Sequence, residues 1–218
     1  MRLEEARNEA IQEARRLTQL QPVYLDTETT GLKQYDQICD IAVIDTDGTT
    51  LLDVLVKPTI AISQGASAIH HITDSDVETA PMFDDILPRV LEVVKDRILV
   101  IYNRAYDLRM IEQAARAVSI NLDDIGYESA HCAMELFAQF YGEWNDYHQS
   151  FRWQKLNFAA RHFGIPLPPD LHRARADTEL TRLVMLEMAN AKLTARARAG
   201  GLTKKLPARF NLAGSFFL

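Results

Sequence analysis

The sequence predicts an α/β protein in which one mixed β-sheet carries helices on its faces. Apolar runs of strand length occur at 23–25, 38–45, 51–57 and 98–102. The second and third runs flank Asp47-Gly48, a pair of residues that favours a tight hairpin turn. Segments with helical spacing of apolar residues precede and follow these runs. This order of elements is typical of a sheet covered by helices.

The first part of the chain predicts a helix followed by a meander. Apolar residues recur at helical spacing over residues 1–17, at Leu3, Ala6, Ala10, Ala14 and Leu17. We expect this amphipathic helix to pack on the core, with a partner surface as the alternative. The first strand ends at Asp26, and the first three strands are expected to form an antiparallel meander.

The middle and end of the chain predict one further strand and several helices. Thr73 followed by Asp76 has the spacing of a capping box, which predicts a helix start. Pro88 is expected to kink or bound a helix over 81–94. The run 98–102 is the fourth strand, and it is too apolar to be exposed on both faces. Further helices are predicted at 106–118, 131–141, 153–163 and 174–197, with an extended loop at 166–169.

Length and composition favour one domain with a sizeable core. The chain has 218 residues, within the range of a single domain. No apolar run is long enough to span a membrane, and residues 1–20 lack the hydrophobic core of a signal peptide. Cys39 and Cys132 lie far apart and fit no zinc spacing. We expect both to be buried thiols of a cytoplasmic protein.

The distribution of charge argues against a protein that coats a long duplex. The formal net charge is −6, yet residues 191–218 contain six basic and no acidic residues. Residues 1–190 therefore carry −12. Binding along many phosphates needs the opposite sign, so an acidic body disfavours a protein that grips a long duplex by charge.

Asp26 and Glu28 follow the first buried strand and are separated by one residue. Alternate residues of a strand point to the same face. Two carboxylates on one face resist burial unless a cation lies between them, and oxygen ligands suit Mg²⁺ or Mn²⁺. The alternative for this segment alone is a solvated acidic turn.

Two later blocks complete a recognisable pattern. Asn103-Arg104-Ala105-Tyr106-Asp107 follows the fourth strand, and His172 precedes Asp177 by five residues at the start of the last helix. Together with Asp26-Thr27-Glu28, these blocks give D-x-E, an aromatic residue before Asp, and H-x(4)-D in order. The set resembles the DEDDh branch of the DnaQ-like 3'-5' exonucleases, the family of the proofreading epsilon subunit of DNA polymerase III. The resemblance covers roughly Pro22 to Leu193 and implies a ribonuclease H-like fold.

The resemblance implies a site with two divalent cations, Mg²⁺ or Mn²⁺. The implied ligands are Asp26, Glu28, Asp107 and Asp177. Asp26 would bridge both ions, and Asp177 would hold the ion that activates water. His172 is the candidate general base, because imidazole takes up a proton near neutral pH. The alternative for this histidine is a surface residue in a proline-rich loop.

The resemblance also implies where the terminal nucleotide binds. The implied substrate-binding residues are Thr27, Thr29, Gly31, Leu32, Asn103 and Tyr106. Threonine hydroxyls and main-chain N–H groups bind sugar and phosphate, and Gly31 lets the backbone approach closely. Leu32 would wedge against the last bases, with core packing as the alternative. Asn103 would hydrogen-bond the strand, and Tyr106 would pack under the sugar.

Several positions depart from the family pattern or have two interpretations. Tyr102 stands where many relatives have His, Tyr106 where Phe is usual, and Asp40 where Glu is common. Asp40 is expected to be structural. His70 and His71 are expected to pack in a loop, with a place along the strand path as the alternative. The side chains of Arg173 and Arg175 either reach phosphates or are solvated.

The sequence predicts a metal-dependent 3'-5' exonuclease that releases nucleoside 5'-monophosphates from DNA 3' ends, preferably single-stranded. The form Asp-Thr-Glu-Thr-Thr-Gly-Leu at 26–32 favours DNA over RNA. The alternatives are an exoribonuclease, a non-catalytic accessory module of a polymerase or repair complex, and a small-molecule phosphodiesterase. We expect an N-terminal helix at 1–20, an exonuclease domain at 21–197 and a basic tail at 198–218. The tail would dock on a polymerase, a clamp or single-stranded nucleic acid, or fold back on the domain.

Overall fold

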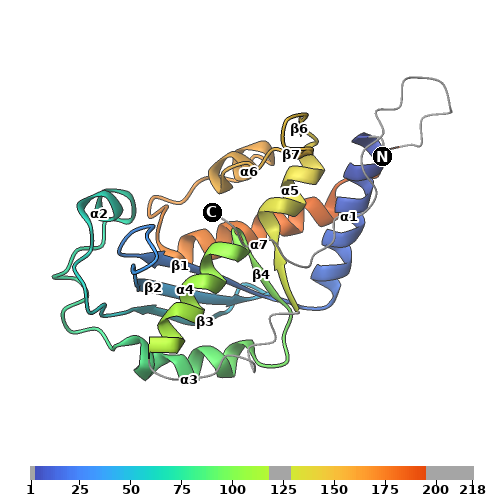
Figure 1. Cartoon of the computed structure of the whole chain (residues 1–218). Helices are drawn as coiled ribbons and strands as arrows, with labels where there is room; N and C mark the ends of the chain where they lie inside the picture. Colours follow the sequence, from blue (N-terminus) through green and yellow to red (C-terminus); the bar gives the residue numbers. More distant parts are fainter. Residues whose placement is uncertain (1–2, 118–128, 195–218) are drawn as a thin grey trace.

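The computed structural model describes residues 3–117 and 129–194 and contains a five-stranded mixed sheet with helices on both faces (Figure 1). The strands of this sheet are β1 (Val23–Thr29), β2 (Ile38–Asp45), β3 (Thr50–Leu55), β4 (Leu99–Ile101) and β5 (Ala130–Cys132). Their order is β3-β2-β1-β4-β5. β1, β2 and β3 pair antiparallel, whereas β4 and β5 continue the sheet in parallel with β1. The predicted mixed sheet and its meander are thus confirmed.

Seven helices and a small hairpin surround the sheet in the described residues. The helices are α1 (Leu3–Gln19), α2 (Gln64–His70), α3 (Phe83–Val94), α4 (Arg104–Ala117), α5 (Ala133–Tyr141), α6 (Leu156–His162) and α7 (Ala174–Asn190). β6 (Trp144–Asn145) and β7 (Ser150–Phe151) form the hairpin. No helix in the described ranges is both long and apolar enough to cross a bilayer.

The alternation of side chains along β1 divides the core into two layers. Val23 and Leu25 pack with residues of α3 and α4. Tyr24 packs on the opposite face, with residues of α1, α5 and α7. Because alternate strand residues point to opposite faces, the even-numbered residues of β1 face α7 and the odd-numbered residues face α4. This parity decides which helices can contribute to a site at the end of β1.

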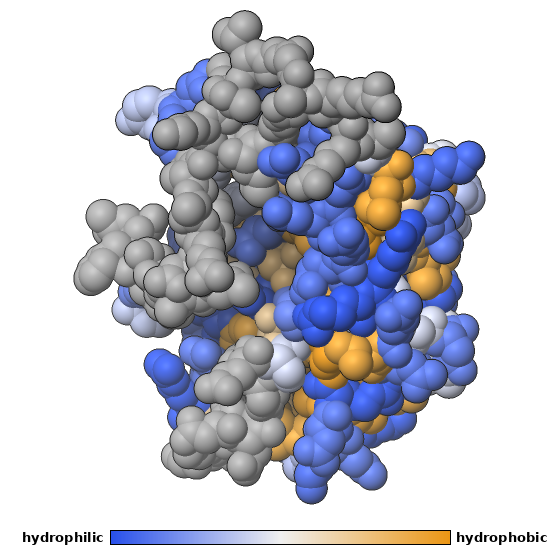
Figure 2. Space-filling model, turned by 90° about the vertical axis from the view of Figure 1, so that its right-hand side faces the viewer, coloured by the Kyte–Doolittle hydropathy of each residue, from blue (hydrophilic) through white to orange (hydrophobic). Residues whose placement is uncertain are grey.

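Helix α1 is part of the second core layer. Its buried residues are Ala6, Ala10, Ile11, Ala14 and Leu17, whereas Leu3 is exposed. The guanidinium of Arg15 donates to the carbonyls of Ala189 and Ala191 at 2.7 Å each, at the C-terminal end of α7. The packing role predicted for this helix is confirmed. Figure 2 shows the α1 side of the molecule, where the uncovered surface is largely hydrophilic with separate apolar patches.

Several predicted elements were wrong or misplaced. Thr73 begins a turn and no helix follows: its N–H donates to Asp76 at 2.8 Å, as in a capping box, but the chain then turns so that Val77 packs with Cys39. The helices expected at 131–141, 153–163 and 174–197 are shorter and begin or end at Ala133, Leu156 and Asn190. Pro88 lies inside α3. Helix α2, strand β5 and the β6–β7 hairpin were not predicted. Cys132 is only half-buried, in contrast to Cys39.

Candidate active site

Three carboxylates meet at the C-terminal end of β1. Asp26 and Glu28 point to the α7 face of the sheet, and Asp177 approaches from the first turn of α7. One carboxylate oxygen from each residue lies within 4.8 Å of the other two. Asp177 is buried and the other two are partly buried. The expected acidic group is therefore assembled from one strand and one helix that lie about 150 residues apart in the chain.

Asp107 reaches the same end of β1 from the opposite face. It lies in the first turn of α4, is 3% exposed, and its Oδ1 accepts from the N–H and the hydroxyl of Thr27 at 3.0 and 2.7 Å. Thr27 is an odd-numbered residue of β1 and so faces α4. Asp107 is not one of the three carboxylates within 4.8 Å, but after burial its charge is the largest cause of the raised pKa of Asp26. Burial raises the pKa of Asp107 to about 7, although the Thr27 hydrogen bonds act to lower it.

The carboxylates of the acidic group have raised pKa values, so they are stabilised either by protonation or by a bound cation. Burial raises the pKa of Asp26 well above its ordinary range, and the charges of Asp107 and Glu28 raise it further. Burial raises the pKa of Glu28 to about 9, with the charge of Asp177 as the next cause. Carboxylates that repel one another in a desolvated site are stabilised by a bound cation. The donor set of carboxylate oxygens suits hard divalent ions.

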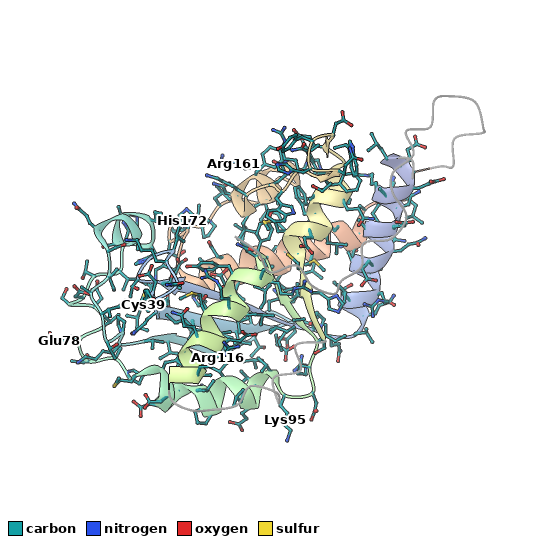
Figure 3. The ribbon with its side chains drawn as sticks, in the orientation of Figure 1. Cys39, Glu78, Lys95, Arg116, Arg161 and His172 are labelled. Carbon is teal, nitrogen blue, oxygen red and sulfur yellow. The ribbon has the colours of Figure 1, made fainter. Side chains whose placement is uncertain are left out.

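His172 lies beside Asp177 on the loop between α6 and α7 (Figure 3). Its N–H donates to Oδ1 of Asp177 at 3.2 Å, and its ring Nδ1 lies 3.7 Å from Oδ2 of the same carboxylate. The backbone of His172 has a φ of 67°, in the left-handed region. Its side chain is 45% exposed. Burial raises the pKa of Asp177, and the hydrogen bond from His172 opposes this shift.

Asp40 attaches the start of α7 to the sheet. It pairs directly with Glu28 across β1 and β2, and it is 1% exposed. Its Oδ2 accepts from Nε of Arg173 at 2.8 Å and from the N–H of Ala174 at 3.2 Å. Its Oδ1 has no hydrogen-bond partner among the described residues. The structural interpretation of Asp40 is supported, and Arg173 pairs with this buried acid although its side chain remains 38% exposed.

The turn after β1 is closed by side chains. The hydroxyl of Thr29 lies 2.8 Å from the carbonyl of Gly31 and 2.5 Å from the hydroxyl of Tyr106, which itself donates to Gly31 at 3.0 Å. Asp36 lies against Gly31, so that a Cβ on this glycine would be 2.6 Å from Oδ2 of Asp36. A side chain at residue 31 would thus have to displace the carboxylate of Asp36. The hydroxyl of Tyr106 adds a hydrogen bond to this turn.

Two large side chains project from the loop beyond Gly31. Leu32 is 79% exposed and Tyr35 is 75% exposed. The core-packing alternative for Leu32 is therefore wrong. Tyr35 was not predicted from the sequence, because a single aromatic residue in a polar loop carries no periodic signal. Asn103 is also exposed, and its carbonyl accepts from the N–H of Tyr106 at 2.9 Å at the start of α4.

His70 is a buried residue that contacts the last residue of β1. It is 2% exposed, its Nδ1 accepts from the N–H of Ile72 at 3.1 Å, and its Nε2 lies 3.2 Å from the carbonyl of Thr29. Because Nδ1 acts as an acceptor, Nε2 carries the hydrogen and donates to Thr29. His71 ends α2 in the left-handed region. The packing role predicted for this pair is confirmed for His70.

The mixed sheet and the acidic group at its centre define a nuclease of the DEDD class. The exonuclease (RNase T) family profile matches residues 23–185, so the chain belongs to this family of DnaQ-like 3'-5' exonucleases. The family implies divalent metal ions at the acidic group.

Similar proteins include exonucleases and polymerases. An uncharacterized exonuclease of Escherichia phage 186, CP81, is 40% identical over 162 residues, which cover 73% of this chain and 83% of that protein. PolC-type DNA polymerase III of Caldanaerobacter subterraneus is 28% identical over 170 residues, which cover 76% of this chain but 11% of the polymerase.

Solved structures share the fold. Exonuclease X in complex with 5'-overhanging duplex DNA is 25% identical with a TM-score of 0.54, over 77% of this chain and 90% of that one. Exonuclease I of E. coli in complex with a dA16 oligonucleotide is 18% identical with a TM-score of 0.65, over 78% of this chain and 40% of that one. The ribonuclease H-like fold implied by the sequence is confirmed.

Proposed function

We propose that the chain removes nucleotides from DNA 3' ends with two divalent cations, Mg²⁺ or Mn²⁺, held by four carboxylates. The proposed ligands are Asp26, Glu28, Asp107 and Asp177. The observation that carries the proposal is the meeting of three carboxylate oxygens within 4.8 Å in a largely buried setting. Carboxylates so placed, with raised pKa values, fit a site for hard cations. The non-catalytic alternative is disfavoured because all four acids are intact.

Bound cations would supply the positive charge that stabilises the pentacovalent phosphate and the leaving oxygen. His172 is proposed to accept the proton of the attacking water as general base. Its Nδ1 faces Asp177 at 3.7 Å, which leaves Nε2 as the nitrogen that receives the proton. The carboxylate of Asp177 then stabilises the imidazolium that forms. The partial exposure of the ring gives it access to solvent water.

The terminal nucleotide is proposed to bind over the turn that follows β1. The proposed contacts are Thr27, Thr29, Gly31, Leu32, Asn103 and Tyr106. The exposure of Leu32 and Asn103 supports their direct contact with the strand. Thr29 and Tyr106 hydrogen-bond each other, so their side chains would form a rigid surface on which the sugar packs. Thr27 already donates to Asp107 and would act by holding that carboxylate.

DNA is the proposed substrate, and nucleoside 5'-monophosphates are the proposed products. Two relatives support DNA: exonuclease X, whose structure contains duplex DNA, and a PolC-type DNA polymerase. An exoribonuclease remains the second candidate, because discrimination depends on contacts to the 2'-hydroxyl. Docking of the basic tail, which lies outside the described residues, on a polymerase or clamp and a cytoplasmic location remain predictions.

The test compares DNA and RNA strands of one sequence, each labelled at the 5' end, with Mg²⁺ or Mn²⁺. We expect a ladder that shortens from the 3' end, faster on DNA, with nucleoside 5'-monophosphates identified by chromatography. Faster shortening of RNA would reassign the substrate. Failure to shorten either strand by a protein that binds Mn²⁺ would contradict the proposed function.

A further inference from the structure

A short loop between β7 and α6 lies at the same end of the sheet as the acidic group. The hydroxyl of Tyr102 donates to the carbonyl of Gln154 at 2.9 Å. Tyr102 follows β4 directly, and α4, which carries Asp107 in its first turn, begins two residues later at Arg104. β4 is the parallel neighbour of β1. The loop is therefore anchored to the strand end next to the one that carries Asp26 and Glu28.

The anchored loop presents an unpartnered tryptophan. Trp153 is 63% exposed, and in the described part of the chain its ring makes no hydrogen bond and no contact with another aromatic ring. The next residue, Gln154, is held through its backbone and its side chain. Its carbonyl accepts from Tyr102, and its side-chain amide donates to the carboxylate of Glu143 at 3.0 Å. Arg152 donates its N–H to Glu143 at 2.8 Å. A single exposed ring is common on protein surfaces; what indicates a binding surface here is the fixed backbone of Trp153 and its place at the end of the sheet that carries the acidic group.

The surroundings of Trp153 favour nucleic acid over an apolar protein partner. Lys155, two residues after it, is an exposed cation, whereas the exposed Arg152 is paired with the carboxylate of Glu143 at 3.1 Å. On the other flank of the acidic group, the loop after β1 exposes Leu32 and Tyr35. Aromatic rings beside cations are the features that bind single strands, because bases stack on the rings and phosphates contact the cations. A base is free to stack in this way only where it is not already stacked within a duplex.

We propose that Trp153 stacks on an unpaired base of the substrate, upstream of the 3'-terminal nucleotide, with Lys155 beside the adjacent phosphate. The inference rests on the proposed function and extends it to the substrate class. The enzyme would hold single strands and 3' overhangs through this contact, and it would bind blunt duplex ends more weakly. Leu32 and Trp153 would then contact the strand from opposite sides of the acidic group.

The test is steady-state kinetics on two substrates, a single-stranded dodecathymidylate and the p-nitrophenyl ester of thymidine 5'-monophosphate. The ester reaches only the terminal-nucleotide site. Trp153→Ala should raise KM for the oligonucleotide about tenfold, within the range typical of the loss of one base–aromatic stack. We expect kcat on the oligonucleotide and turnover of the ester to stay within about twofold of the wild type. Trp153→Phe should restore KM, because it keeps an aromatic face.

A matched control is Tyr147→Ala. Tyr147 is 89% exposed in the turn at the far end of the β6–β7 hairpin from Arg152, and its removal should leave KM unchanged. In protein carrying Trp144→Phe, Trp153 is the remaining one of the two tryptophans, and oligonucleotide binding should quench its fluorescence.

The outcomes separate the inference from the proposed function. An active wild type with an unchanged KM in Trp153→Ala would overturn the inference alone. Equal losses in Trp153→Ala and Tyr147→Ala, or a loss of ester turnover in Trp153→Ala, would also overturn it, because a general surface or folding effect would then explain the data. A wild type that hydrolyses neither substrate would overturn the proposed function and the inference with it.

Discussion

Asp26, Glu28 and Asp177 hold their carboxylate oxygens within 4.8 Å of one another, and the burial of Glu28 and of Asp107 has a consequence for stability. The pKa of Glu28 rises from an ordinary 4.5 to about 9, and that of Asp107 from 3.8 to about 7. Between the ordinary and the raised pKa, the folded protein binds more protons than the unfolded chain. Stability in this window therefore falls as the pH rises.

We predict that the Tm of the metal-free protein in EDTA falls between about pH 5 and about pH 9. Saturating Mn²⁺ should offset the fall, because cations bind the deprotonated acids. Thermal unfolding at several pH values measures both effects. Glu28→Gln is the control and should flatten the slope. A Tm in EDTA that rises steadily to pH 9 would contradict this interpretation of the acidic group.

Gly31 is a second position where one residue fixes the local structure. A Cβ there would lie 2.6 Å from Oδ2 of Asp36. This oxygen accepts a hydrogen bond from the N–H of Lys33, and Oδ1 of Asp36 accepts one from the hydroxyl of Thr30. Gly31→Ala should displace Asp36 and cost about 1–2 kcal/mol of folding free energy, the value of one or two hydrogen bonds. Chemical denaturation measures this loss.

Gly65→Ala is the matched control for Gly31→Ala. Gly65 lies in α2, where an added Cβ would meet no atom within 4 Å. A helical alanine should stabilise the protein by up to about 1 kcal/mol. Equal effects at the two positions would show that the close approach of Asp36 does not restrict residue 31.

At the scale of elements, the start of α7 depends on Asp40 of β2. The helix carries Asp177 and is preceded by His172, so its attachment to the sheet sets the position of both. Asp40 is the acceptor for Arg173 and for the N–H of Ala174. Removal of a buried partner leaves an unpaired charge, although the 38% exposure of the Arg173 side chain reduces that cost.

We predict that Asp40→Ala lowers the free energy of unfolding by about 2–3 kcal/mol and lowers kcat at least tenfold. Asp40→Glu should retain most activity, because it keeps the charge and the acceptor. Asp53→Ala is a suitable control, since Asp53 is 41% exposed and lies 3.6 Å from Arg175; such surface pairs contribute little. Denaturation and steady-state kinetics measure the two effects. Wild-type kcat in a folded Asp40→Ala protein would refute the positioning role.

The sequence predicted the long elements and the short apolar strand β4, but it missed α2 and the other short strands. β2 remains largely apolar over eight residues, which is enough for a strand signal, whereas β1 was predicted to end at Asp26 and continues to Thr29, because its last residues are all polar. β5 has three residues and β6 and β7 have two each, so they carry no period. Helix α2 buries only His70 and thus has no apolar stripe. At Thr73 the capping hydrogen bond is present, but the chain forms a turn and not a helix, and this turn packs Val77 into the core.

At the scale of the whole molecule, the order of the acidic blocks was readable from the sequence but their meeting was not. Asp26 and Asp177 come together because α7 packs across the face of the sheet to which the even residues of β1 point. The placement of Asp107 on the opposite face follows from α4 covering that face. The exposure of Tyr35 and Trp153 also depends on tertiary packing, and no pattern in the sequence indicates it.

The central claim is that the carboxylates at the end of β1 hold the metal ions for removal of nucleotides from 3' ends. The most direct measurement is a time course on 5'-labelled single-stranded DNA with Mg²⁺, comparing the wild type with Asp26→Ala. Removing one of the three clustered carboxylates should lower the rate at least about a thousandfold, because the metal site loses its central ligand. Circular dichroism should show that the variant remains folded. A folded Asp26→Ala protein that shortens the strand at the wild-type rate would contradict the account.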